Sequence, residues 1–550
     1  MAKTPANNTA NKRMLDADAS QWHHAEIRSF ADIVRHWAVA RPDHVALKHA
    51  DLSTTYRELD RLSSRIANAL IERGFPPGTN AGYLGKNSCL FWGVWFGAVK
   101  ARCTMAPFNW RCSAAELVEI FRDSCTPIVF VGDEFAGIAE QILTTGDLDL
   151  EIVVFDPSLP PEKSVTEFLG DVASDDPALE AMPDDGVLLS YTSGTTGVPK
   201  GVLATQQAFE YSHLCNALEP DWSWTKDDRF IMSMPNFHLG GSWVTLTTLY
   251  HGAQVLIMPA FDPVDFMALL RSERATMAAL VPVAIRMLLE SEGSSKADFE
   301  TLHSITYFGS PIDSDTLMRA QAVIDCDLKQ SYGTTETYFL TMLGSADHRD
   351  AKGERLRSCG RPLPLVQIEI RNADGFACAP GSVGELFVRT PMVMAGYWMR
   401  PDATHEVLED GWYRTGDLGY RDEDGYFFIV DRARDMIISG GENIYSAEVE
   451  NALAKLQGVA ASAVIGLPDD KWGERVTAFI IPQPNAEMTE EMVTGHCRAL
   501  IAGYKVPRQI IFVDQLPMTP TGKIQKAKIK AEWIAGAASG KPEVESNRDA

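Results

Sequence analysis

Residues 191–201, with the sequence YTSGTTGVPKG, are the most informative stretch of the chain. They follow the apolar residues 187–189, which we expect to form a strand, and precede a stretch that we expect to be helical. Three glycines allow tight turns that expose backbone N–H groups, four Ser and Thr hydroxyls add donors, and Lys200 adds a positive charge. The segment therefore predicts a polyphosphate-binding loop. Its spacing is not the G-x-x-x-x-G-K-[ST] of ordinary phosphate loops, and a flexible linker is the alternative.

The composition favours a folded protein of two or three domains, because the chain has 550 residues, of which 45% are hydrophobic. A formal net charge of −24 opposes binding to nucleic acid, and no apolar run reaches the length of a membrane span. Nine irregularly spaced cysteines without a C-x-x-C pair argue against a disulfide framework or a zinc site. The N-terminal region lacks the apolar stretch of a secretory signal. We therefore expect a cytoplasmic protein with no nucleic-acid partner and no integral membrane segment.

Turn-rich and charged stretches indicate the domain organisation. Residues 422–425 (DEDG) predict a turn, and residues 431–435 (DRARD) form a charge cluster without periodicity. A helix is expected to begin near Ser446. Strand-like and helix-like segments alternate along the chain, which suggests α/β layers. We expect a disordered tail at 1–20, a large domain at 21–432, a small domain at 433–535 and a second disordered tail at 536–550.

Three further segments carry residues suited to a nucleotide-using enzyme. The segment QSYGTTE ends in Glu336, a hard oxygen ligand that suits Mg²⁺; without a metal, a carboxylate would repel bound phosphates. The segment YRTGDLG holds Asp417, whose two oxygens can accept from both hydroxyls of a ribose. The segment PTGKI holds Lys523, which can offset the repulsion between a carboxylate and a phosphate. Taken singly, these residues also fit a helix N-terminus, a turn and a solvated surface.

These four segments, in this order, resemble the signatures of the adenylate-forming superfamily, which includes acyl-CoA synthetases, peptide-synthetase adenylation domains and beetle luciferases. The resemblance extends from about residue 30 to about residue 530. It implies an α/β fold with a large N-terminal domain of mixed sheets sandwiched with helices, and a small mobile C-terminal α+β domain. It also implies that ATP and Mg²⁺ activate a carboxylic acid as acyl-AMP with release of pyrophosphate. The acyl group then passes to coenzyme A (CoA).

Site residues follow from the same resemblance. Tyr332 is expected to stack on the adenine, and Asp417, helped by Arg432, is expected to bind the ribose. The expected Mg²⁺ ligands are Thr195 and Glu336. The expected catalytic residues are Lys523, Glu336 and Lys200. The expected ATP-binding residues are Thr192, Ser193, Gly194, Thr195, Thr196, Gly197, Lys200, Gly309, Ser310, Pro311, Ser331, Tyr332, Gly333, Thr334, Asp417, Arg432 and Lys523.

The location of Lys523 in the small domain permits a switch between two half-reactions. In the family this lysine serves adenylate formation, and the small domain then turns so that another face admits the thiol. The pivot corresponds to Arg434, where the family more often has lysine or aspartate. The expected CoA-facing residues are Gly440, Gly441 and Trp472, with a core position as the alternative for the tryptophan.

The sequence indicates only the chemical class of the carboxylic acid substrate. The segment PNFHLGG matches the region that lines the acyl site, and His238 stands where amino-acid-activating relatives have aspartate, so an α-amino acid is disfavoured. Gly333 stands where acetate-specific relatives carry tryptophan and implies a deeper pocket; Gly309 completes the expected acyl pocket. The segments FNWR and MAGYW, at residues 108–111 and 394–398, resemble the fatty-acyl and aryl-acyl branches.

The sequence therefore predicts an acyl-CoA synthetase. A medium- or long-chain fatty acid is the first choice of substrate, and an aryl or cyclic acid is the second. The alternatives are a ligase that loads a carrier protein, a luciferase-like oxygenase and a nucleotide-sensing protein that keeps the fold. Assembly as a homodimer is left open.

Overall fold

The computed structural model describes residues 26–146, 148–192, 199–291, 295–350, 353–440, 442–518 and 524–538. The chain divides into two compact units. Unit one comprises Met1–Gln367 and Arg389–Tyr413, and unit two comprises Ile368–Val388 and Arg414–Ala550. A large α/β unit with sheets and helices and a smaller second unit confirm the predicted fold class. The boundary between residues 432 and 433 stays a prediction. The expected tails lie outside the described residues, except for residues 536–538, which end helix α18.

One sheet of unit one has seven strands in the order β18-β8-β7-β4-β3-β5-β6. The neighbours among β4, β3, β5 and β6 are parallel, whereas β7 and β8 form an antiparallel pair. Strands β3 and β5 are buried along their whole length, as is typical of strands covered on both faces. The bounds are β3 (Asn80–Leu84), β4 (Thr104–Pro107), β5 (Ile128–Gly132), β6 (Glu151–Phe155), β7 (Gly186–Thr192), β8 (Lys200–Thr205) and β18 (Gly396–Tyr397).

Strand β8 corrects one prediction. The helix expected directly after the phosphate-loop segment is wrong, because β8 occupies that place and helix α9 (Gln206–Leu218) begins only after it. The register between β7 and β8 runs from Gly186 opposite Thr205 to Thr192 opposite Lys200. Pairing with β7 thus holds the apolar residues after Lys200 in the sheet. The side chain of Thr205 then caps α9, which sets the start of the helix.

The second sheet of unit one has nine strands in the order β15-β14-β13-β12-β11-β9-β10-β1-β2. Its six strands from β13 to β1 are parallel, and antiparallel strands flank them at both edges. The bounds are β1 (Val45–His49), β2 (Leu52–Thr55), β9 (Arg229–Met232), β10 (Gln254–Ile257), β11 (Met277–Leu280), β12 (Ser304–Phe308), β13 (Asp327–Thr334), β14 (Tyr338–Leu343) and β15 (Arg361–Pro362).

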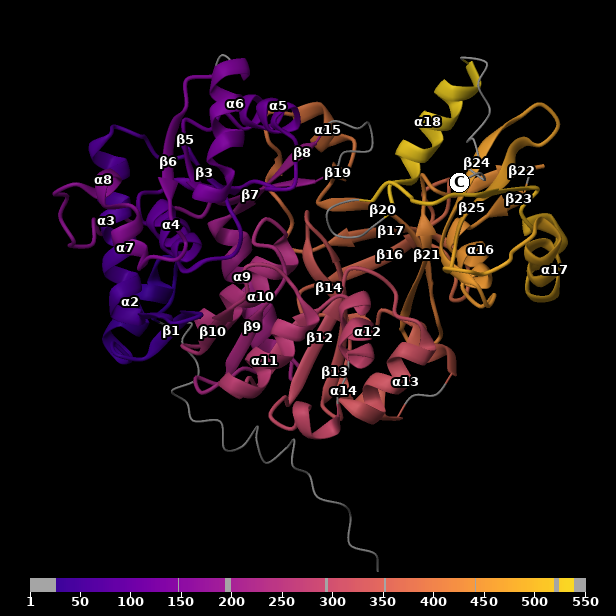
Figure 1. Cartoon of the computed structure of the whole chain (residues 1–550), viewed down its shortest axis with the longest axis horizontal. Coiled ribbons are helices and arrows are strands. Elements are labelled where there is room, and N and C mark those ends of the chain that lie inside the picture. The colour runs from indigo at the N-terminus through magenta and orange to yellow at the C-terminus, as the bar shows by residue number, and fades with distance from the viewer. Residues whose placement is uncertain are drawn as a thin grey trace, which may run out of the picture. The chain divides into compact units, whose positions relative to one another are not determined.

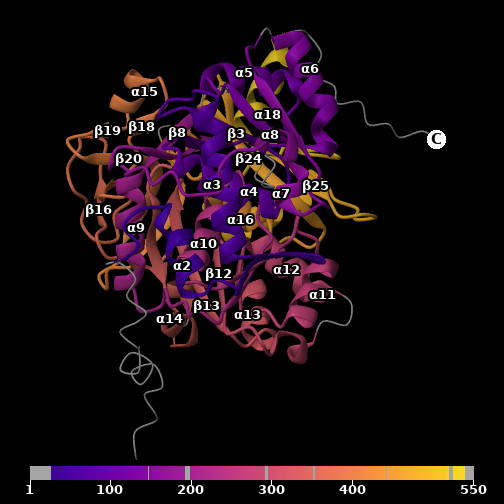
Figure 2. The ribbon, with the colours of Figure 1, turned by 90° about the vertical axis from the view of Figure 1, so that its left-hand side faces the viewer.

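Helix α4 (Cys89–Lys100) packs against strands of both sheets of unit one. It contacts β3 and β4 of one sheet, β1 of the other, and helix α3 (Tyr56–Glu72) beside it (Figure 2). All its residues are buried, which explains why its sequence is apolar on every side. The other helices of unit one include α2 (Asp32–Ala40), α5 (Ala114–Ser124), α6 (Ala136–Gly146), α7 (Pro161–Ser164), α8 (Thr166–Leu169), α10 (Leu239–Tyr250), α11 (Pro263–Glu273), α12 (Pro282–Glu290), α13 (Ser314–Val323), α14 (Ser345–Asp350) and α15 (Pro401–His405).

Unit two is built largely from antiparallel strands. One sheet has the order β16-β17-β20-β19 with β21 paired to β20, and its strand β19 consists of residues assigned to unit one. The other sheet has the order β23-β22-β25-β24 with β26 paired to β25. Helices α16 and α18 pack on β24 (Figure 1). The bounds are β16 (Gln367–Arg371), β17 (Gly384–Arg389), β19 (Leu408–Glu409), β20 (Trp412–Arg421), β21 (Phe427–Arg432), β22 (Ile437–Ser439), β23 (Glu442–Ile444), α16 (Ser446–Leu453), β24 (Val459–Asp469), β25 (Gly473–Pro482), α17 (Glu490–Leu500), β26 (Gln509–Phe512) and α18 (Lys526–Ala538).

Two local predictions in this unit are confirmed. The DEDG segment forms the turn between β20 and β21, where Asp422 accepts from the N–H of Tyr426 and Gly425 has φ of +87°. Helix α16 begins at Ser446, as expected.

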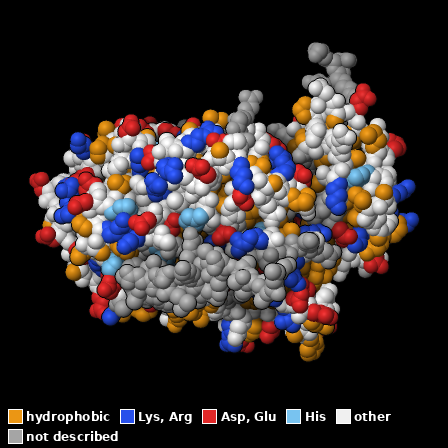
Figure 3. Space-filling view, turned by 90° about the horizontal axis from the view of Figure 1, so that it is seen from below, with side chains coloured by type: hydrophobic (Ala, Val, Ile, Leu, Met, Phe, Trp, Pro, Cys, Tyr) orange, Lys and Arg blue, Asp and Glu red, His pale blue; other side chains and the backbone are white. Residues whose placement is uncertain are grey.

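The surface mixes charges of both signs. On the face drawn in Figure 3, described acidic and basic side chains are interspersed with apolar ones. None of the helices in the described part of the chain has both the length and the apolar character that crossing a bilayer requires.

Candidate active site

Three predicted segments follow the carboxyl ends of strands in the nine-stranded sheet. Strand β9 leads toward His238, β12 leads to Gly309, and β13 ends in residues 332–334. Because β9, β11, β12 and β13 are consecutive parallel neighbours, these ends lie along one edge of the sheet, where α/β proteins bind ligands. A Cβ atom at Gly240 would lie 2.3 Å from the ring of Phe308, the last residue of β12. The segment after β9 and the end of β12 therefore pack closely. The fold thus brings the predicted acyl and adenine segments together within unit one.

The backbone at Gly309 is open to a ligand. Its φ of +91° favours glycine, and an added Cβ atom would meet only Val281, at 3.6 Å. Ser310 and Pro311 are exposed beside it. This stretch therefore leaves room for a flat group to approach the main chain.

The structure gives a local reason for glycine at position 333 that the sequence did not reveal. It lies at a β-bulge between β13 and β14, and an added Cβ atom would lie 1.9 Å from the carbonyl oxygen of Tyr338. The register of the sheet therefore requires glycine here whatever the depth of the pocket. Ser331, also predicted to bind ATP, is fully buried and donates its hydroxyl to the carbonyl oxygen of Thr341. Tyr332 and Thr334 are partly exposed at the end of the strand.

Glu336 lies in the turn after β13, and its side chain is held by a tyrosine. The hydroxyl of Tyr397 donates to Oε1 of Glu336 over 2.9 Å, and the N–H of Met394 donates to the Glu336 carbonyl oxygen over 2.7 Å. Burial and the neighbouring carboxylate raise the pKa of Tyr397. Burial, again with the Glu336 charge, also raises the pKa of Tyr413 nearby. Both phenols stay protonated and can donate hydrogen bonds at neutral pH.

Lys200 shares the same tyrosine. Its Nζ lies 4.8 Å from the centroid of the Tyr397 ring, which is a cation–π distance. Strand β18 pairs with β8 so that Tyr397 lies opposite Val202, and this pairing sets the position of the ring. Thr192 donates its hydroxyl to the Lys200 carbonyl oxygen at the base of the hairpin. The predicted loop residues Ser193, Gly194, Thr195, Thr196 and Gly197 lie outside the described residues.

The donor set fits Mg²⁺ bound to a nucleotide. Among the described residues no group of three or more His, Cys, Asp or Glu side chains converges as a metal cage. Mg²⁺ usually takes one or two carboxylates from the protein and completes its shell with phosphate oxygens and waters. Glu336, whose carboxylate accepts from the Tyr397 hydroxyl, is a residue that could supply one such carboxylate.

An aromatic cluster adjoins the predicted acyl segment. The ring of His238, at the N-terminus of α10, lies 4.5 Å from that of Phe237, which makes an edge contact with Trp110 at 6.4 Å. The guanidinium of Arg111 lies 4.2 Å from the Trp110 ring and 5.9 Å from the Phe237 ring. Burial lowers the pKa of Arg111, which nevertheless keeps its charge. Trp110 and Phe237 belong to separate segments that the sequence alone did not join.

In unit two, the predicted ribose residues meet. Asp417 lies opposite Arg432 across β20 and β21, and its Oδ1 is 2.7 Å from Nε of Arg432. The carboxylate is almost fully buried, and Gly416 before it has φ of +71°. The N–H of Asp417 donates to the hydroxyl of Thr415. These contacts fix the carboxylate within strand β20, so the carboxylate lies on a paired strand and not on a turn.

The predicted CoA-facing residues of unit two are also in contact. The N–H of Gly440 donates to the Trp472 carbonyl oxygen over 2.7 Å, and a Cβ atom at Gly440 would lie 2.9 Å from the indole. Two cations flank the same ring: the guanidinium of Arg508 at 4.1 Å and Nζ of Lys471 at 4.8 Å. Gly441 lies outside the described residues. Trp472 is partly exposed, so it is not a fully buried core residue.

The predicted hinge residue is among the described residues, whereas the predicted catalytic lysine is not. Arg434 lies between β21 and β22, with its Nε 3.7 Å from Asp435. Lys523 lies outside the described residues, but the chain just after it is anchored: Lys526 binds Glu450 at 2.8 Å and Ser446 at 2.6 Å.

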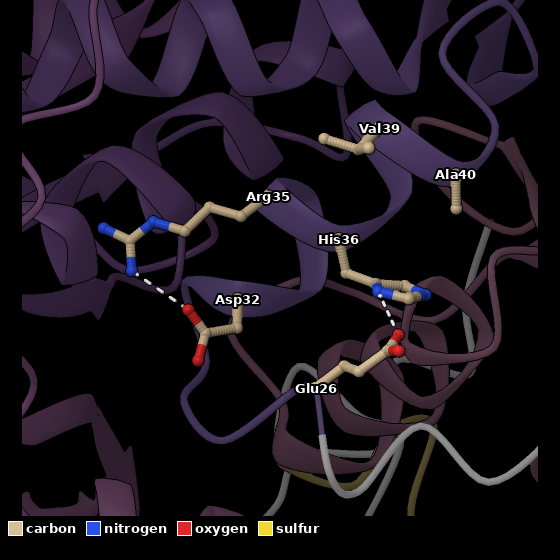
Figure 4. Close-up of a pocket in the computed structure, with 6 residues that line it drawn as sticks. All are labelled: Glu26, Asp32, Arg35, His36, Val39 and Ala40. Carbon is tan, nitrogen blue, oxygen red and sulfur yellow. Dashed lines mark hydrogen bonds and ion pairs between the residues drawn. The ribbon is translucent and has the colours of Figure 1, made fainter.

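A surface pocket lies apart from these residues. It lies along α2 and is lined by Glu26, Asp32, Arg35, His36, Val39 and Ala40 (Figure 4). Its polar groups pair with one another, His36 with Glu26 at 2.9 Å and Arg35 with Asp32 at 3.1 Å. It contains none of the predicted site residues.

Sequence reasoning missed three residues that contact predicted ones: Tyr397, Arg508 and Lys471. Tyr397 stood within the MAGYW segment, which served only to choose a branch of the family. Arg508 is 36 positions from Trp472 in the sequence, and only the parallel pairing of β25 with β26 brings the two together. Lys471, next to Trp472, could have been found as a basic residue beside an aromatic one.

The features of both units define a class of protein. In unit one, Lys200 at the start of β8 and Glu336 after β13 both contact Tyr397, which places a cation and a carboxylate at one aromatic ring, an arrangement that suits a nucleotide-using enzyme. The chain belongs to the AMP-binding enzyme family: the family model matches residues 34–398, and the model of the AMP-binding enzyme C-terminal domain matches residues 448–523. It is an AMP-forming acid–thiol ligase of the adenylate-forming superfamily.

Curated relatives cover nearly the whole chain. A fatty acid–[acyl-carrier-protein] ligase, ScoC of Streptomyces coeruleorubidus, is 36% identical over 94% of this chain and 98% of its own length. The long-chain-fatty-acid–CoA ligase FadD13 of Mycobacterium tuberculosis is 32% identical over 88% of this chain and 94% of its own. A feruloyl-CoA synthase of Amycolatopsis is 35% identical over 90% and 98%, respectively.

Solved structures of adenylate-forming enzymes are also similar to this chain in fold. ATP-bound MatB from Rhodopseudomonas palustris superposes with a TM-score of 0.81 at 28% identity, over 92% of this chain and 99% of that one. O-succinylbenzoate CoA synthetase from Bacillus subtilis, in complex with ATP and a magnesium ion, gives a TM-score of 0.79 at 28% identity, over 90% and 98%.

Proposed function

We propose that this protein is an acyl-CoA synthetase that uses ATP and Mg²⁺ to activate a fatty acid. In the first step a carboxylate oxygen attacks the α-phosphorus of ATP, and the bond to the β-phosphate oxygen breaks to release pyrophosphate. In the second step the thiol sulfur of CoA, losing its proton, attacks the acyl carbonyl carbon and AMP leaves. The observation that supports the first step is that Tyr397 contacts both Lys200 and Glu336.

In the first step, residues of this chain are proposed to bind and orient ATP and to offset its negative charge. When bound, Mg²⁺ would neutralise phosphate charge, and Glu336, with Thr195 from the loop, is proposed to hold it. Lys200 is proposed to face the phosphates, Tyr332 the adenine, and Asp417 with Arg432 the ribose. Ser193, Gly194, Thr196 and Gly197 are proposed as loop donors, and Lys523 as the lysine that offsets repulsion as carboxylate and α-phosphate approach.

The acceptor is proposed to be CoA because of the surroundings of Trp472. An indole flanked by Arg508 and Lys471 suits a nucleotide, since the ring can stack on adenine and the cations can pair with phosphates. The arm of a carrier protein lacks that adenine. The likeness to ScoC favours a second candidate, loading of a carrier protein. Arg434 is kept as the proposed hinge.

The acid is proposed to be apolar. His238 replaces the aspartate that would balance a substrate ammonium, and the rings of Phe237 and Trp110 lie beside it. A medium- or long-chain fatty acid is the first choice, in line with what FadD13 is named for, and an aryl acid, as in the feruloyl-CoA synthase, is the second. A cytoplasmic location is also proposed, and a homodimer stays open.

An acid-dependent ATP–pyrophosphate exchange screen tests the first step across fatty, aryl and amino acids. Each acid that supports exchange is then incubated with CoA or with a holo-carrier protein, and the thioester is measured by mass spectrometry. We expect exchange with fatty acids and a thioester with CoA. Exchange with no acid would refute the proposal, and a thioester only with the carrier protein would favour the second candidate.

A further inference from the structure

Residues 394–400 form a connecting segment that is tied to both strands of the β7–β8 hairpin, the two strands that flank the predicted phosphate loop in the sequence. On one side, the N–H of Ala395 donates to the Leu203 carbonyl oxygen over 2.9 Å, and the N–H of Trp398 donates to that of Gly201 over 2.7 Å. These bonds fix the segment to strand β8, which begins at Lys200. At its start, the bond from Met394 to Glu336 fixes it to the turn after β13.

The other end of the segment is anchored to strand β7. The guanidinium of Arg400 binds the carboxylate of Asp123, which lies in helix α5. The same carboxylate accepts from the hydroxyl of Tyr191 over 2.8 Å, and Tyr191 lies at the other side of the hairpin. Residues 394–400 therefore have little freedom relative to either strand.

Tyr397 lies in the middle of this anchored segment and makes two different contacts. Its hydroxyl donates to Oε1 of Glu336 over 2.9 Å, and its ring face lies 4.8 Å from Nζ of Lys200. The carboxylate would otherwise rotate freely at the end of a flexible side chain in a turn. The ammonium would likewise sample many rotamers. One rigid aromatic side chain restricts both.

We propose that Tyr397 is the positioning residue that holds the Glu336 carboxylate and the Lys200 ammonium in place before Mg²⁺ and ATP bind. The proposal rests on the proposed function, since it deepens the roles given there to Glu336 and Lys200. Groups that hydrogen-bond to a metal-binding carboxylate orient it, and their loss commonly weakens metal affinity by about 10- to 100-fold. The contact with the ring is independent of that hydroxyl, so the two roles can be separated by substitution.

Two variants separate the roles. Tyr397→Phe keeps the ring and removes the hydroxyl, whereas Tyr397→Leu removes both. Binding of ATP is measured by titration calorimetry at a series of Mg²⁺ concentrations and in EDTA, which requires no acid substrate. For Tyr397→Phe we expect the Mg²⁺ concentration for half-maximal binding to rise by about tenfold, with unchanged ATP affinity in EDTA. Tyr211→Phe, at an exposed tyrosine of α9, is the matched control and should behave as the wild type.

The contact with Lys200 is tested by lysine modification. Trinitrobenzenesulfonate is added to the protein without ATP, and the rate at Lys200 is followed by peptide mass spectrometry. We expect a severalfold faster reaction in Tyr397→Leu and a wild-type rate in Tyr397→Phe. Unchanged Mg²⁺ dependence in Tyr397→Phe, or an unchanged rate at Lys200 in a folded Tyr397→Leu, would overturn the inference. If the wild-type protein bound no ATP, the proposed function would fail, and the modification rates would still decide the Lys200 contact.

Discussion

The Nε atom of Arg432 lies 2.7 Å from Oδ1 of the buried Asp417 carboxylate, directly across an antiparallel strand pair. A carboxylate that is 2% exposed and paired in this way has one fixed orientation. The pair therefore offers a ligand a defined acceptor, at the position proposed for the ribose.

Replacing Asp417 with Asn tests that role. Because a hydrogen bond to a charged group contributes more than a neutral one, the KM for ATP should rise on the order of 10- to 100-fold. The measurement is ATP–pyrophosphate exchange at varied ATP concentration. Asp51→Asn, at an exposed aspartate between β1 and β2, is the control. Equal KM values in both variants would remove Asp417 from the ATP site.

Replacing Trp472 with Ala should separate the two half-reactions. Loss of a stacking surface for adenine should raise the KM for CoA roughly tenfold, while ATP–pyrophosphate exchange stays at the wild-type rate. Arg508→Met should act in the same direction, since Arg508 lies against the same ring. Arg498→Met, at an exposed cation of α17, is the control. If carrier-protein loading and CoA transfer were equally insensitive to Trp472→Ala, the proposed contact would be wrong.

The substitution Lys523→Ala tests the switch between half-reactions, in which the resemblance gives Lys523 a role only in adenylate formation. Adenylate formation should slow on the order of 100-fold or more, because the substitution removes a charge that stabilises the transition state. Thioester formation from supplied acyl-adenylate should be largely spared. The two half-reactions are measured separately by exchange and by mass spectrometry of the thioester. An equal loss in both would contradict the role.

His348 should make stability depend on pH. Its Nδ1 lies 2.8 Å from the Gly344 carbonyl oxygen, which can only accept, so Nδ1 carries the proton and Nε2 accepts from the Tyr307 hydroxyl. Burial lowers the pKa of His348 below its ordinary value of about 6.5. The unfolded state then binds more protons below that pH. The stabilisation is complete above pH 6.5 and is lost as the pH falls toward the folded-state pKa.

The measurement is urea unfolding between pH 7.5 and 5.5. His348→Gln should reduce the slope of unfolding free energy against pH by up to about 1.4 kcal/mol per pH unit. The exposed His405→Gln is the control. An unchanged slope in His348→Gln would mean that the imidazole titrates alike in both states.

Lys526→Met should destabilise unit two. Lys526 pairs with Glu450 at 2.8 Å, and both side chains are mostly buried, so the substitution leaves a buried carboxylate without its partner. The expected cost is about 3–5 kcal/mol, seen as a lower midpoint in urea unfolding. Lys528→Met, which breaks only an exposed pair with Glu532 at 4.0 Å, should change stability by less than about 1 kcal/mol. Similar midpoints in the two variants would count against the buried pair.

The sequence by itself determined the family, the α/β class and the order of the site segments. Those segments depend on local chemistry: glycines that allow a turn, a carboxylate directly after a glycine, and a helix start at Ser446. Such features are recorded in neighbouring residues and can be read along the chain. The paired placement of Asp417 with Arg432 and of Gly440 with Trp472 agrees with roles that the resemblance had grouped.

Only the tertiary structure decided the contacts between distant segments. Strand β8, rather than a helix, follows the loop because pairing with β7 outweighs local preference. Gly333 is required by a carbonyl oxygen of the neighbouring strand, which no motif reveals. Tyr397 reaches both Glu336 and Lys200 because residues 394–400 pair with β8, almost 200 positions earlier in the chain. Long-range pairing of this kind depends on which strands become neighbours, and a single sequence does not record it.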